Sequence, residues 1–485
     1  MKKQVLLPML FIAMLALLTA CGSDELSSSE TTAETSAQLS PAETAPQRDT
    51  VDFASADYNG QSFTILAYDL AFYHEYFFAE EQNGDRMNDA IVEREILTEE
   101  YLGVDIGNYI VPTHRDLAAT VQKTASAGDD AYQLALPHCI RGVSDMLTTG
   151  SLYNWNDLPY IDFSKEYYNH NFTDALSLGD KQFYAVSDYM IANPSCILFN
   201  KDLITNYNLD NPYELVYDGS WTFDKMYDMA KQVTIDLNGD SIMDIHDQYG
   251  ITGEGNWLLN CIPYACEIFL AEKTGDSFKV SYYSDKTITV LEKFHQALNS
   301  DKSMFLWPYL AVKDPATQVA MDSGRALFQL YALYEIYNFR DSDVNFGILP
   351  FPKYDEAQDN YYTNDWGSLM CIPACVGDPE MAAKVIDYLS YISQDTTVPA
   401  YYDVTLGSKL SKDEDSVAMM DIIFENIVYD AGMNYFGFGD NMYYLFYTPE
   451  YLVRINQSVD FASWYAKYGD GAQAEIDTFM ESLSE

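Results

Sequence analysis

The stretch YAVSDYMIANPSCILFNKDLITNYNLD, residues 184–210, places strand-like segments directly before a helix. QFYAVSD, residues 182–188, and SCILFNKDL, residues 195–203, are predicted to form two strands, and the second leads into a helix. Because a strand that feeds a helix is the repeating unit of α/β proteins, this stretch predicts that class of fold.

The segments on both sides of this stretch continue the alternation of strands and helices. QSFTILAY (61–68), AYQLALPH (131–138) and VNFGILPFP (344–352) are predicted as strands. NDAIVEREILTEEYLG (88–103) is predicted as a helix capped at Asn88 and ended near Gly103, and SWTFDKMYDMAKQV (220–233) as a helix capped at Thr222. A further helix carries Val385, Leu389 and Ile392 on one face. No internal repeat is visible.

The first fifty residues of the chain contain features that indicate export. Lys2 and Lys3 precede an apolar run that is too short for a confident membrane span, which is typical of a signal peptide covering 1–20. LTAC (18–21) resembles the bacterial lipobox, in which the cysteine becomes the acylated N-terminus, here Cys21. An ordinary signal peptide followed by a chance cysteine is the alternative. Residues 21–51 contain little that can be buried and are predicted to be a flexible tether.

The chain is strongly acidic. Its formal charge is −47, and removal of Lys2 and Lys3 with the signal leaves 25 basic against 74 acidic residues, or −49. A nucleic acid would be repelled by such a surface, so it is excluded as a partner. The six cysteines after Cys21 lack histidines at zinc-ligand spacing, and we interpret them as buried thiols, although export would permit disulfides.

The segment DLNGDSIMDIHDQYG, residues 236–250, has the spacing of a calcium-binding loop. Six oxygens would come from Asp236, Asn238, Asp240, the carbonyl of Ile242, Asp244 and Asp247. The usual glycine at the sixth position is replaced by Ser241, and the usual glutamate at the last by aspartate. We expect a structural Ca²⁺ that pins this connection. A solvated turn is the alternative, because Asn-Gly-Asp is also an ordinary turn.

Four blocks of this sequence, in order, resemble the extracellular solute-binding proteins of ABC transporters of the maltose-binding type (family 1). The first is the opening stretch with its Asn-Lys-Asp-Leu run. The others are GRALFQLYALYEI (324–336), NFGILPFPKYDE (345–356) and IPACVGDPEMAAKVIDYLSYIS (372–393). The resemblance spans about residues 60–400 and depends on the order of the blocks.

This resemblance implies an α/β, two-lobed, periplasmic-binding-protein-like clamshell with a ligand cleft between the lobes. Lobe 1 would comprise 52–185 and 345–395, and lobe 2 would comprise 186–344 and 396–485. Closure of such a fold around its ligand is a hinge motion.

Candidate ligand-binding residues follow from the same resemblance: His138, Arg141, Asp188, Tyr189, Trp257, Tyr331, Tyr334, Asp365 and Trp366. Sugars offer hydroxyl groups and apolar C–H faces, so aromatic rings beside carboxylates and planar donors suit them. Trp366 is the leading candidate, because a tryptophan between Asp and Gly in a polar loop has little reason to be buried. For the others a structural role is the alternative: a salt bridge for Arg141, a solvated loop for Asp188, and core packing for Tyr189, Trp257, Tyr331 and Tyr334.

The function that the resemblance implies is capture of a carbohydrate, chiefly an oligosaccharide, by a lipoprotein at the outer face of the bacterial cell membrane. The ligand would be delivered to ABC permease subunits, and the protein would be a monomer that is not an enzyme and contacts the membrane through its lipid alone. An exported glycoside hydrolase or a surface adhesin is the alternative, since two carboxylates suffice for hydrolysis. The sequence contains no Gly-x-Ser-x-Gly, His-Glu-x-x-His or phosphate-binding glycine-rich motif.

Overall fold

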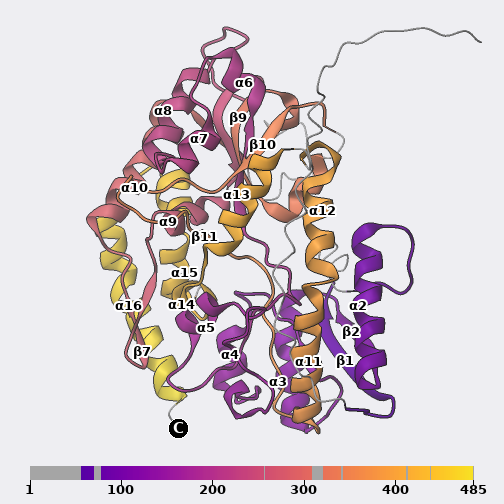
Figure 1. Ribbon diagram of the computed structural model, residues 1–485. Helices are drawn as coiled ribbons and strands as arrows, with labels where there is room; N and C mark the ends of the chain where they lie inside the picture. The colour runs from indigo at the N-terminus through magenta and orange to yellow at the C-terminus, as the bar shows by residue number, and fades with distance from the viewer. Residues whose placement is uncertain are drawn as a thin grey trace, which may run out of the picture. The chain divides into compact units, whose positions relative to one another are not determined.

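The computed structural model describes residues 56–69, 78–255, 257–307, 321–339, 342–410, 413–436 and 439–483. The predicted signal peptide, the acylated Cys21 and the tether lie outside these residues. The body that begins at Phe53 forms one compact unit, and Figure 1 shows its helices and strands.

The described residues contain short strands and many helices. The strands are β1 (Gln61–Tyr68), β2 (Val104–Val111), β3 (Leu134–Ala135), β4 (Ser195–Asn200), β5 (Tyr249–Glu254), β6 (Ala271–Thr274), β7 (Ser277–Val280), β8 (Met304–Trp307), β9 (Ala326–Ala332), β10 (Phe346–Leu349), β11 (Thr363–Asn364) and β12 (Ile427–Val428). The α-helices are α2 (Arg86–Leu102), α3 (His114–Ala127), α4 (Val143–Thr148), α5 (His170–Leu176), α6 (Lys201–Asn206), α7 (Pro212–Tyr217), α8 (Phe223–Val233), α9 (Cys261–Ala265), α10 (Asp285–His295), α11 (Pro379–Ser393), α12 (Thr397–Leu410), α13 (Glu414–Glu425), α14 (Ala431–Asn434), α15 (Asp440–Phe446) and α16 (Phe461–Ser482). Shorter or wider helical turns are η1 (Trp155–Asp157), η2 (Leu258–Asn260), η3 (Gln296–Ser300), η6 (Met321–Ser323), η7 (Leu333–Phe339) and η8 (Pro449–Ile455).

The first sheet is parallel and has the strand order β2-β1-β3. The predicted strand 61–68 is confirmed as β1, and its last four residues are buried. The predicted strand 131–138 is reduced to the two residues of β3, and isolated bridges from Ala135 to Cys371 and from His138 to Ser368 continue the pairing. The first sheet is therefore completed by a segment that returns from far along the chain.

The predicted strand 182–188 does not form as a regular strand. The Val186 carbonyl accepts a hydrogen bond from the Asn169 backbone N–H, whereas Ala185 exchanges backbone hydrogen bonds with Met370. Because its backbone groups alternate between two partners, only isolated bridges result.

The second sheet has five strands in the order β10-β4-β9-β5-β8. β4 confirms the predicted strand that leads into a helix: all its residues are buried, and the Asn200 side chain caps α6 by accepting from the Asp202 and Leu203 N–H groups. β10 pairs antiparallel with β4. Our sequence-based boundary, which assigned 345–395 to lobe 1, is therefore wrong for β10, because pairing partners so distant in sequence cannot be read from a strand's own composition.

The predicted helices form with small changes at their ends. The N-cap of α2 is Asp85 rather than Asn88, since the Asp85 carboxylate accepts from the N–H groups of Met87 and Asn88. Gly103 ends that helix in the left-handed conformation, φ 65°. Thr222 caps α8 as predicted, and the residues Met226, Met229, Ala230 and Val233 are buried along one face.

Two segments that connect the first and second sheets run side by side. We call residues 193–195 and 363–366 the crossing ribbon. Pro194 and Asp365 form an antiparallel bridge, the Trp366 N–H donates to the Asn193 carbonyl, and the Thr363 hydroxyl donates to the Ser195 carbonyl at 2.9 Å. The chain leaves the first sheet through one strand of this ribbon and returns through the other.

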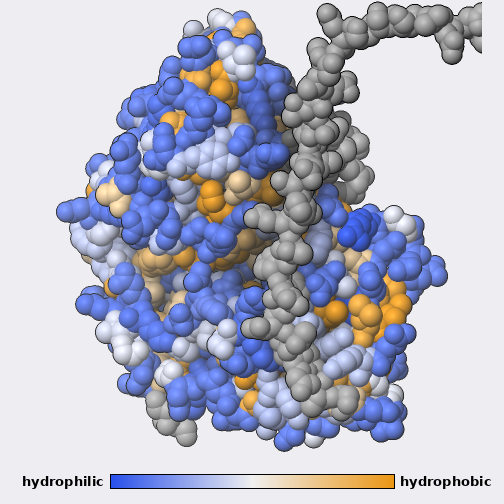
Figure 2. Space-filling model, in the orientation of Figure 1, coloured by the Kyte–Doolittle hydropathy of each residue, from blue (hydrophilic) through white to orange (hydrophobic). Residues whose placement is uncertain are grey.

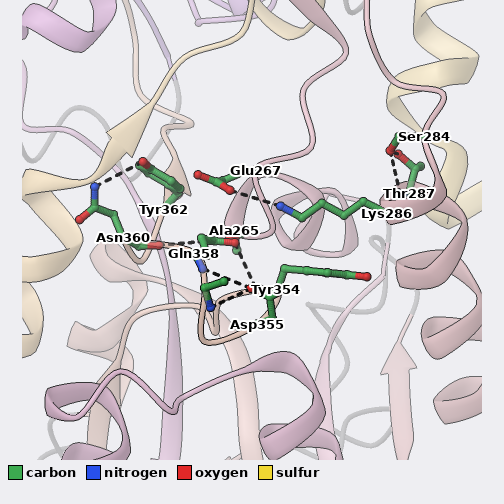
Figure 3. A network of polar contacts seen from close by, with 11 residues as sticks. Ala265, Glu267, Ser284, Lys286, Thr287, Tyr354, Asp355, Gln358, Asn360 and Tyr362 are labelled. Atoms are coloured by element: carbon green, nitrogen blue, oxygen red, sulfur yellow. Dashed lines mark hydrogen bonds and ion pairs between the residues drawn. The ribbon is translucent and has the colours of Figure 1, made fainter.

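The loop between β10 and β11, which leads into the crossing ribbon, is fixed by polar contacts (Figure 3). The Gln358 side-chain amide donates to the carbonyls of Ala265, 2.8 Å, and Asn360, 2.7 Å. Nearby, Lys286 on α10 pairs with Glu267 at 3.3 Å. The bond from Gln358 to Ala265 joins the loop to α9 and so helps to hold the segment that leads to the ribbon.

The surface in Figure 2 is largely hydrophilic, with an apolar patch at the position of α2 and β2. These two elements carry the exposed residues Ile96 and Ile110. Among the residues that the structure describes, none of the helices is both long and apolar enough to cross a lipid bilayer. The six cysteines from Cys139 onward are free thiols, and five of them are buried, as we predicted from the sequence; Cys375 is partly exposed.

Candidate functional site

The carboxyl ends of the first sheet bring three rings together. Tyr68 ends β1, His114 begins the helix after β2, and His138 follows β3. Their ring centroids lie 5.6 to 6.4 Å apart, and the Tyr68 hydroxyl shares a 2.9 Å hydrogen bond with Ser368. In open sheets of this kind, ligands bind outside the carboxyl ends of the strands.

The surroundings of both imidazoles at this edge favour the uncharged form. Burial lowers the pKa of His138 far below its ordinary value, and the neighbouring His114 and Arg141 lower it further. Burial, followed by Arg141 and Arg115, likewise lowers the pKa of His114. The imidazoles can therefore donate or accept hydrogen bonds as neutral groups, while Arg141 supplies the positive charge.

The second sheet offers a different set of groups at its own carboxyl ends. β5 ends at Glu254, and the Trp257 indole N–H donates to the Glu254 carboxylate at 3.2 Å. Gly255 packs so tightly that a Cβ there would lie 3.0 Å from the Arg454 Nε atom and 3.3 Å from the Trp307 carbonyl oxygen. The glycine thus allows Arg454 to approach the strand end.

Aromatic side chains from three parts of the chain meet between these edges. We call Trp257, Trp366, Tyr443, Phe446 and Tyr447 the edge cluster. Trp257 and Trp366 are edge to face at 5.4 Å, and the Trp366 ring lies 6.0 Å from Phe446. The ring centroid of Tyr447 lies 4.7 Å from that of Phe446 and 4.8 Å from that of Tyr443.

The two sides of the site are linked through the loop that carries His138 and Arg141. The Cys139 N–H donates to the Gly367 carbonyl at 3.1 Å, and the Asn434 amide donates to the Cys139 carbonyl at 3.1 Å. Burial and Tyr451 raise the pKa of Tyr443 to about 12, and Arg141 acts in the opposite direction, so Arg141 lies within electrostatic range of α15. The predicted residues His138, Arg141, Trp257 and Trp366 therefore belong to one region.

Trp366 differs from the prediction of an exposed side chain. Only 6% of its surface is exposed, and its indole N–H donates to the Cys261 sulfur at 3.4 Å. The polar residues beside it in the sequence suggest a loop in solvent, but the partners that bury it come from α9 and α15.

The Asp365 carboxylate accepts hydrogen bonds that hold the crossing ribbon together. One carboxylate oxygen accepts from the backbone N–H groups of Asn193, 2.7 Å, and Gly367, 2.8 Å, and the other accepts from the Tyr429 hydroxyl at 3.3 Å. Burial raises the pKa of Asp365, and these hydrogen bonds act against the rise. Its oxygens are already used within the protein, so it braces the ribbon.

Four other predicted residues lie on other elements. Tyr189 is buried with the Arg94 guanidinium 4.4 Å above its ring. Asp188 is half-buried and lines a separate cavity, discussed further below. Tyr331 pairs with Cys196 inside the second sheet and packs on Phe339 at 5.3 Å, and Tyr334 belongs to η7. Tyr189 is buried, whereas Asp188, Tyr331 and Tyr334 are partly exposed, and the role of all four in ligand binding stays a prediction.

The sequence analysis did not predict that the C-terminal helices contribute aromatic residues to the edge cluster. Tyr443, Tyr447 and Tyr451 recur every four residues, a spacing that aligns side chains on one helical face. The Tyr443 and Tyr451 hydroxyls share a 2.9 Å hydrogen bond, and Arg454 pairs with Glu450. Residues 70–77 and 308–320, which come after β1 and β8 in the sequence, lie outside the described residues.

The loop 236–247 shares one backbone feature with calcium loops, but its carboxylates do not converge. Ser241 adopts φ 67°, the conformation for which such loops use glycine. The Asp236 carboxylate, however, accepts from the N–H groups of Gly239 and Ser241, and that of Asp247 accepts from Leu237 and Asp244. Among the described residues, no three His, Cys, Asp or Glu side chains gather closely enough to hold a metal ion.

Comparison with known structures identifies the fold. The galacto-N-biose/lacto-N-biose I-binding protein of a Bifidobacterium longum ABC transporter superposes with a TM-score of 0.62 at 14% identity, over 88% of this chain and 99% of that one. The GacH receptor of Streptomyces glaucescens, solved with acarbose, superposes with a TM-score of 0.57 at 13% identity. The match covers 86% of this chain and 99% of that one. The maltose/maltodextrin-binding domain MalE of Bdellovibrio bacteriovorus, bound to maltotriose, superposes with a TM-score of 0.54 at 14% identity. The match covers 86% of this chain and 100% of that one.

The chain thus has the α/β, two-lobed fold of periplasmic-binding-protein type that the sequence predicted. More particularly, it is the fold of the ABC solute-binding proteins of the maltose-binding type. No family model matches the sequence, and no curated protein matches it.

Proposed function

We propose that this protein captures a carbohydrate, chiefly an oligosaccharide, between the carboxyl edges of its two sheets and delivers it to an ABC importer. The observation that carries the proposal is the edge cluster, in which Trp257 and Trp366 lie beside Glu254 and close to the loop of Arg141. Aromatic faces next to carboxylate and guanidinium groups are the combination that sugars require. The similar solved structures were obtained with maltotriose, lacto-N-biose and acarbose, which supports the same ligand class.

The groups at the site would divide the work of recognition. The exposed part of Trp257 offers an apolar face to the C–H side of a sugar ring, while Glu254 and Arg141 offer an acceptor and donors to its hydroxyls. The neutral His114 and His138 add hydrogen bonds without adding charge. The ligand itself undergoes no chemical step, and differential affinity for the closed state drives the lobes together.

We further propose that Cys21 carries lipid and that the tether holds the protein at the extracellular face of the bacterial cell membrane. The support is the signal-like run and the lipobox resemblance in the sequence. The permease and its ATPase would be separate chains, and the binding protein would act as a monomer.

A structural Ca²⁺ in the loop 236–247 is also proposed, with Asp236, Asn238, Asp240, Ile242, Asp244 and Asp247 as its ligands. The sequence spacing and the left-handed backbone of Ser241 support it. The ion would neutralise neighbouring acids, and the carboxylates would turn from the backbone N–H groups to reach it.

The test of the main proposal is a titration of the exported chain with a panel of oligosaccharides, monosaccharides, polyols and peptides, followed by tryptophan fluorescence and calorimetry. We expect one oligosaccharide class to bind and Trp257→Ala to weaken it by about 30-fold, because stacking and burial are worth about 2 kcal/mol. Tyr283→Ala removes an aromatic ring that is 46% exposed on another surface, and it is the matched control.

Two outcomes would contradict this function. Cleavage of a bound oligosaccharide during long incubation would indicate a glycoside hydrolase instead. Absence of any small ligand, together with tight binding to a surface or a protein partner, would indicate an adhesin. An unchanged affinity in Trp257→Ala would show that the edge cluster is not the site.

A further inference from the structure

A cavity of about 400 Å³ lies between the segments 166–171 and 186–192 on one side and α12 and α13 on the other. We call it the α12–α13 cavity. None of the edge-cluster residues lines it. Its volume is within the range of sites that hold small organic molecules.

Two groups of aromatic rings form walls of the cavity. On the α12 and α13 side, Tyr402 and Phe424 stack with centroids 5.6 Å apart, and Tyr401 meets Phe424 edge to face at 6.1 Å. On the other side, Tyr167 and Tyr168 lie 5.1 Å apart. Both tyrosine hydroxyls on that side donate to Asp387, at 2.9 and 3.1 Å, so their rings are held in place.

Carboxylates outnumber basic groups among the lining residues. Glu166, Asp188 and Glu425 line the cavity together with one histidine, His170, and neither lysine nor arginine is among the lining residues. Burial, followed by Asp421, Asp188 and Glu425, raises the pKa of Tyr402, which places these carboxylates around one aromatic ring. Lys165, which directly precedes the lining residue Glu166, donates to Asp387 at 2.7 Å and lies 5.6 Å from the centroid of the Tyr167 ring.

The cavity is bounded by elements of both sheets. Segment 186–192 follows the Ala185 bridge to Met370 in the first sheet, whereas α13 packs on the core of the second sheet through Met420 and Ile423. The Asn171 side-chain amide donates to the Ile427 carbonyl at 2.9 Å and closes one end. Its shape therefore depends on both halves of the fold.

We propose that the α12–α13 cavity is a second binding site, distinct from the sugar site, and that it takes a small organic cation with an apolar body and an ammonium group. Aromatic faces attract a cation through their quadrupole, and adjacent carboxylates add direct attraction. A neutral ligand would gain neither effect. The proposal does not depend on the protein's binding a sugar.

The probe is choline, compared with its neutral isostere 3,3-dimethyl-1-butanol, which has the same shape without the charge. We expect calorimetry on the exported chain to show choline binding at least tenfold more tightly than the isostere. Phe424→Leu, which keeps the apolar volume but removes the aromatic face, should weaken choline about tenfold. Glu425→Gln should weaken it severalfold, and the effect should shrink at high salt.

The control is Glu272→Gln, which removes an equal charge from an exposed position on β6. Glu425 is also exposed, so neither variant threatens folding. Equal affinity for choline and the isostere, no choline binding, or choline binding unaffected by both cavity variants would overturn the proposal. Displacement of choline by the sugar, with Trp257→Ala abolishing both, would place the cation in the edge cluster and also overturn it.

Discussion

The edge cluster and the α12–α13 cavity are both rich in aromatic rings, yet different charges surround them. The edge cluster has Arg141 and Arg454 near it as well as Glu254. The lining of the α12–α13 cavity has carboxylates without a lysine or arginine. Rings alone provide an apolar face, and the groups beside them decide whether that face suits a neutral polyhydroxyl ligand or a cation. The predictions below test this distinction.

The largest effect is expected at the ribbon that supports the edge cluster. Asp365→Ala leaves the backbone N–H groups of Asn193 and Gly367 buried without an acceptor, and it should lower the free energy of unfolding by about 3 kcal/mol in urea denaturation. Asp365→Asn keeps an oxygen for these donors and should lose less than half as much. A loss under about 1 kcal/mol in Asp365→Ala would show that the ribbon does not depend on this carboxylate.

The second effect tests the electrostatics beside the α12–α13 cavity. Burial raises the pKa of Glu95 from 4.5 to about 7, and Arg94 opposes the rise. Burial raises the pKa of Tyr189, which directly follows the lining residue Asp188; Arg94 opposes the rise and Glu95 adds to it. Because the native state holds this proton more tightly than the unfolded state, ionisation costs stability as pH rises from 4.5 through 7.

Glu95→Gln should therefore stabilise the protein by about 2 kcal/mol at pH 8 and leave it unchanged at pH 4, where the carboxyl is protonated in both states. Thermal and urea unfolding across this pH range measure the difference. Glu93→Gln, at an exposed position on the same helix, is the control. If Glu95→Gln stabilises the protein equally at every pH, the stabilisation comes from packing and not from loss of the buried charge.

The third effect sharpens the role of charge at the edge cluster. Arg141→Leu should weaken oligosaccharide binding about tenfold, or about 1.4 kcal/mol, because guanidinium donors to sugar hydroxyls are lost. Arg115→Leu removes the same charge from an exposed position nearby and should have little effect. Equal losses in both variants would indicate a general electrostatic effect on binding.

The smallest effect concerns the loop 236–247, which belongs to neither aromatic region. Millimolar Ca²⁺ should raise the melting temperature by a few degrees, equivalent to about 1 kcal/mol, and a chelator should reverse the change. Asp236→Ala should abolish the shift without altering sugar affinity. Identical melting with Ca²⁺ and with chelator would leave the loop as a hydrogen-bonded turn.

The parts of the fold that sequence predicted are those that depend on local patterns. β1, β4 and β10 are apolar segments bounded by polar residues, and Thr222 precedes an apolar stripe that defines α8. The position of β10 in the second sheet was not predictable, since it depends on pairing with β4 almost 150 residues earlier.

The site was predicted only in part for the same reason. His138, Arg141 and Trp257 follow strands, and the carboxyl ends of strands are where ligands bind in such folds. Trp366 is buried by Cys261, 105 residues earlier in the sequence, and by Phe446 in the C-terminal part of the chain, and neither partner can be recognised from the residues around Trp366. Tyr443 and Tyr447 were missed because aromatic residues at helical spacing more often indicate a core.

The crossing ribbon also constrains how the protein can move. Pro194 and Asp365 form a β-bridge, and the Trp366 N–H is hydrogen-bonded to the Asn193 carbonyl, so the two connections are coupled to each other. Any displacement of one sheet relative to the other must therefore move both connections at once, and the hydrogen bonds between them oppose a shift of one along the other.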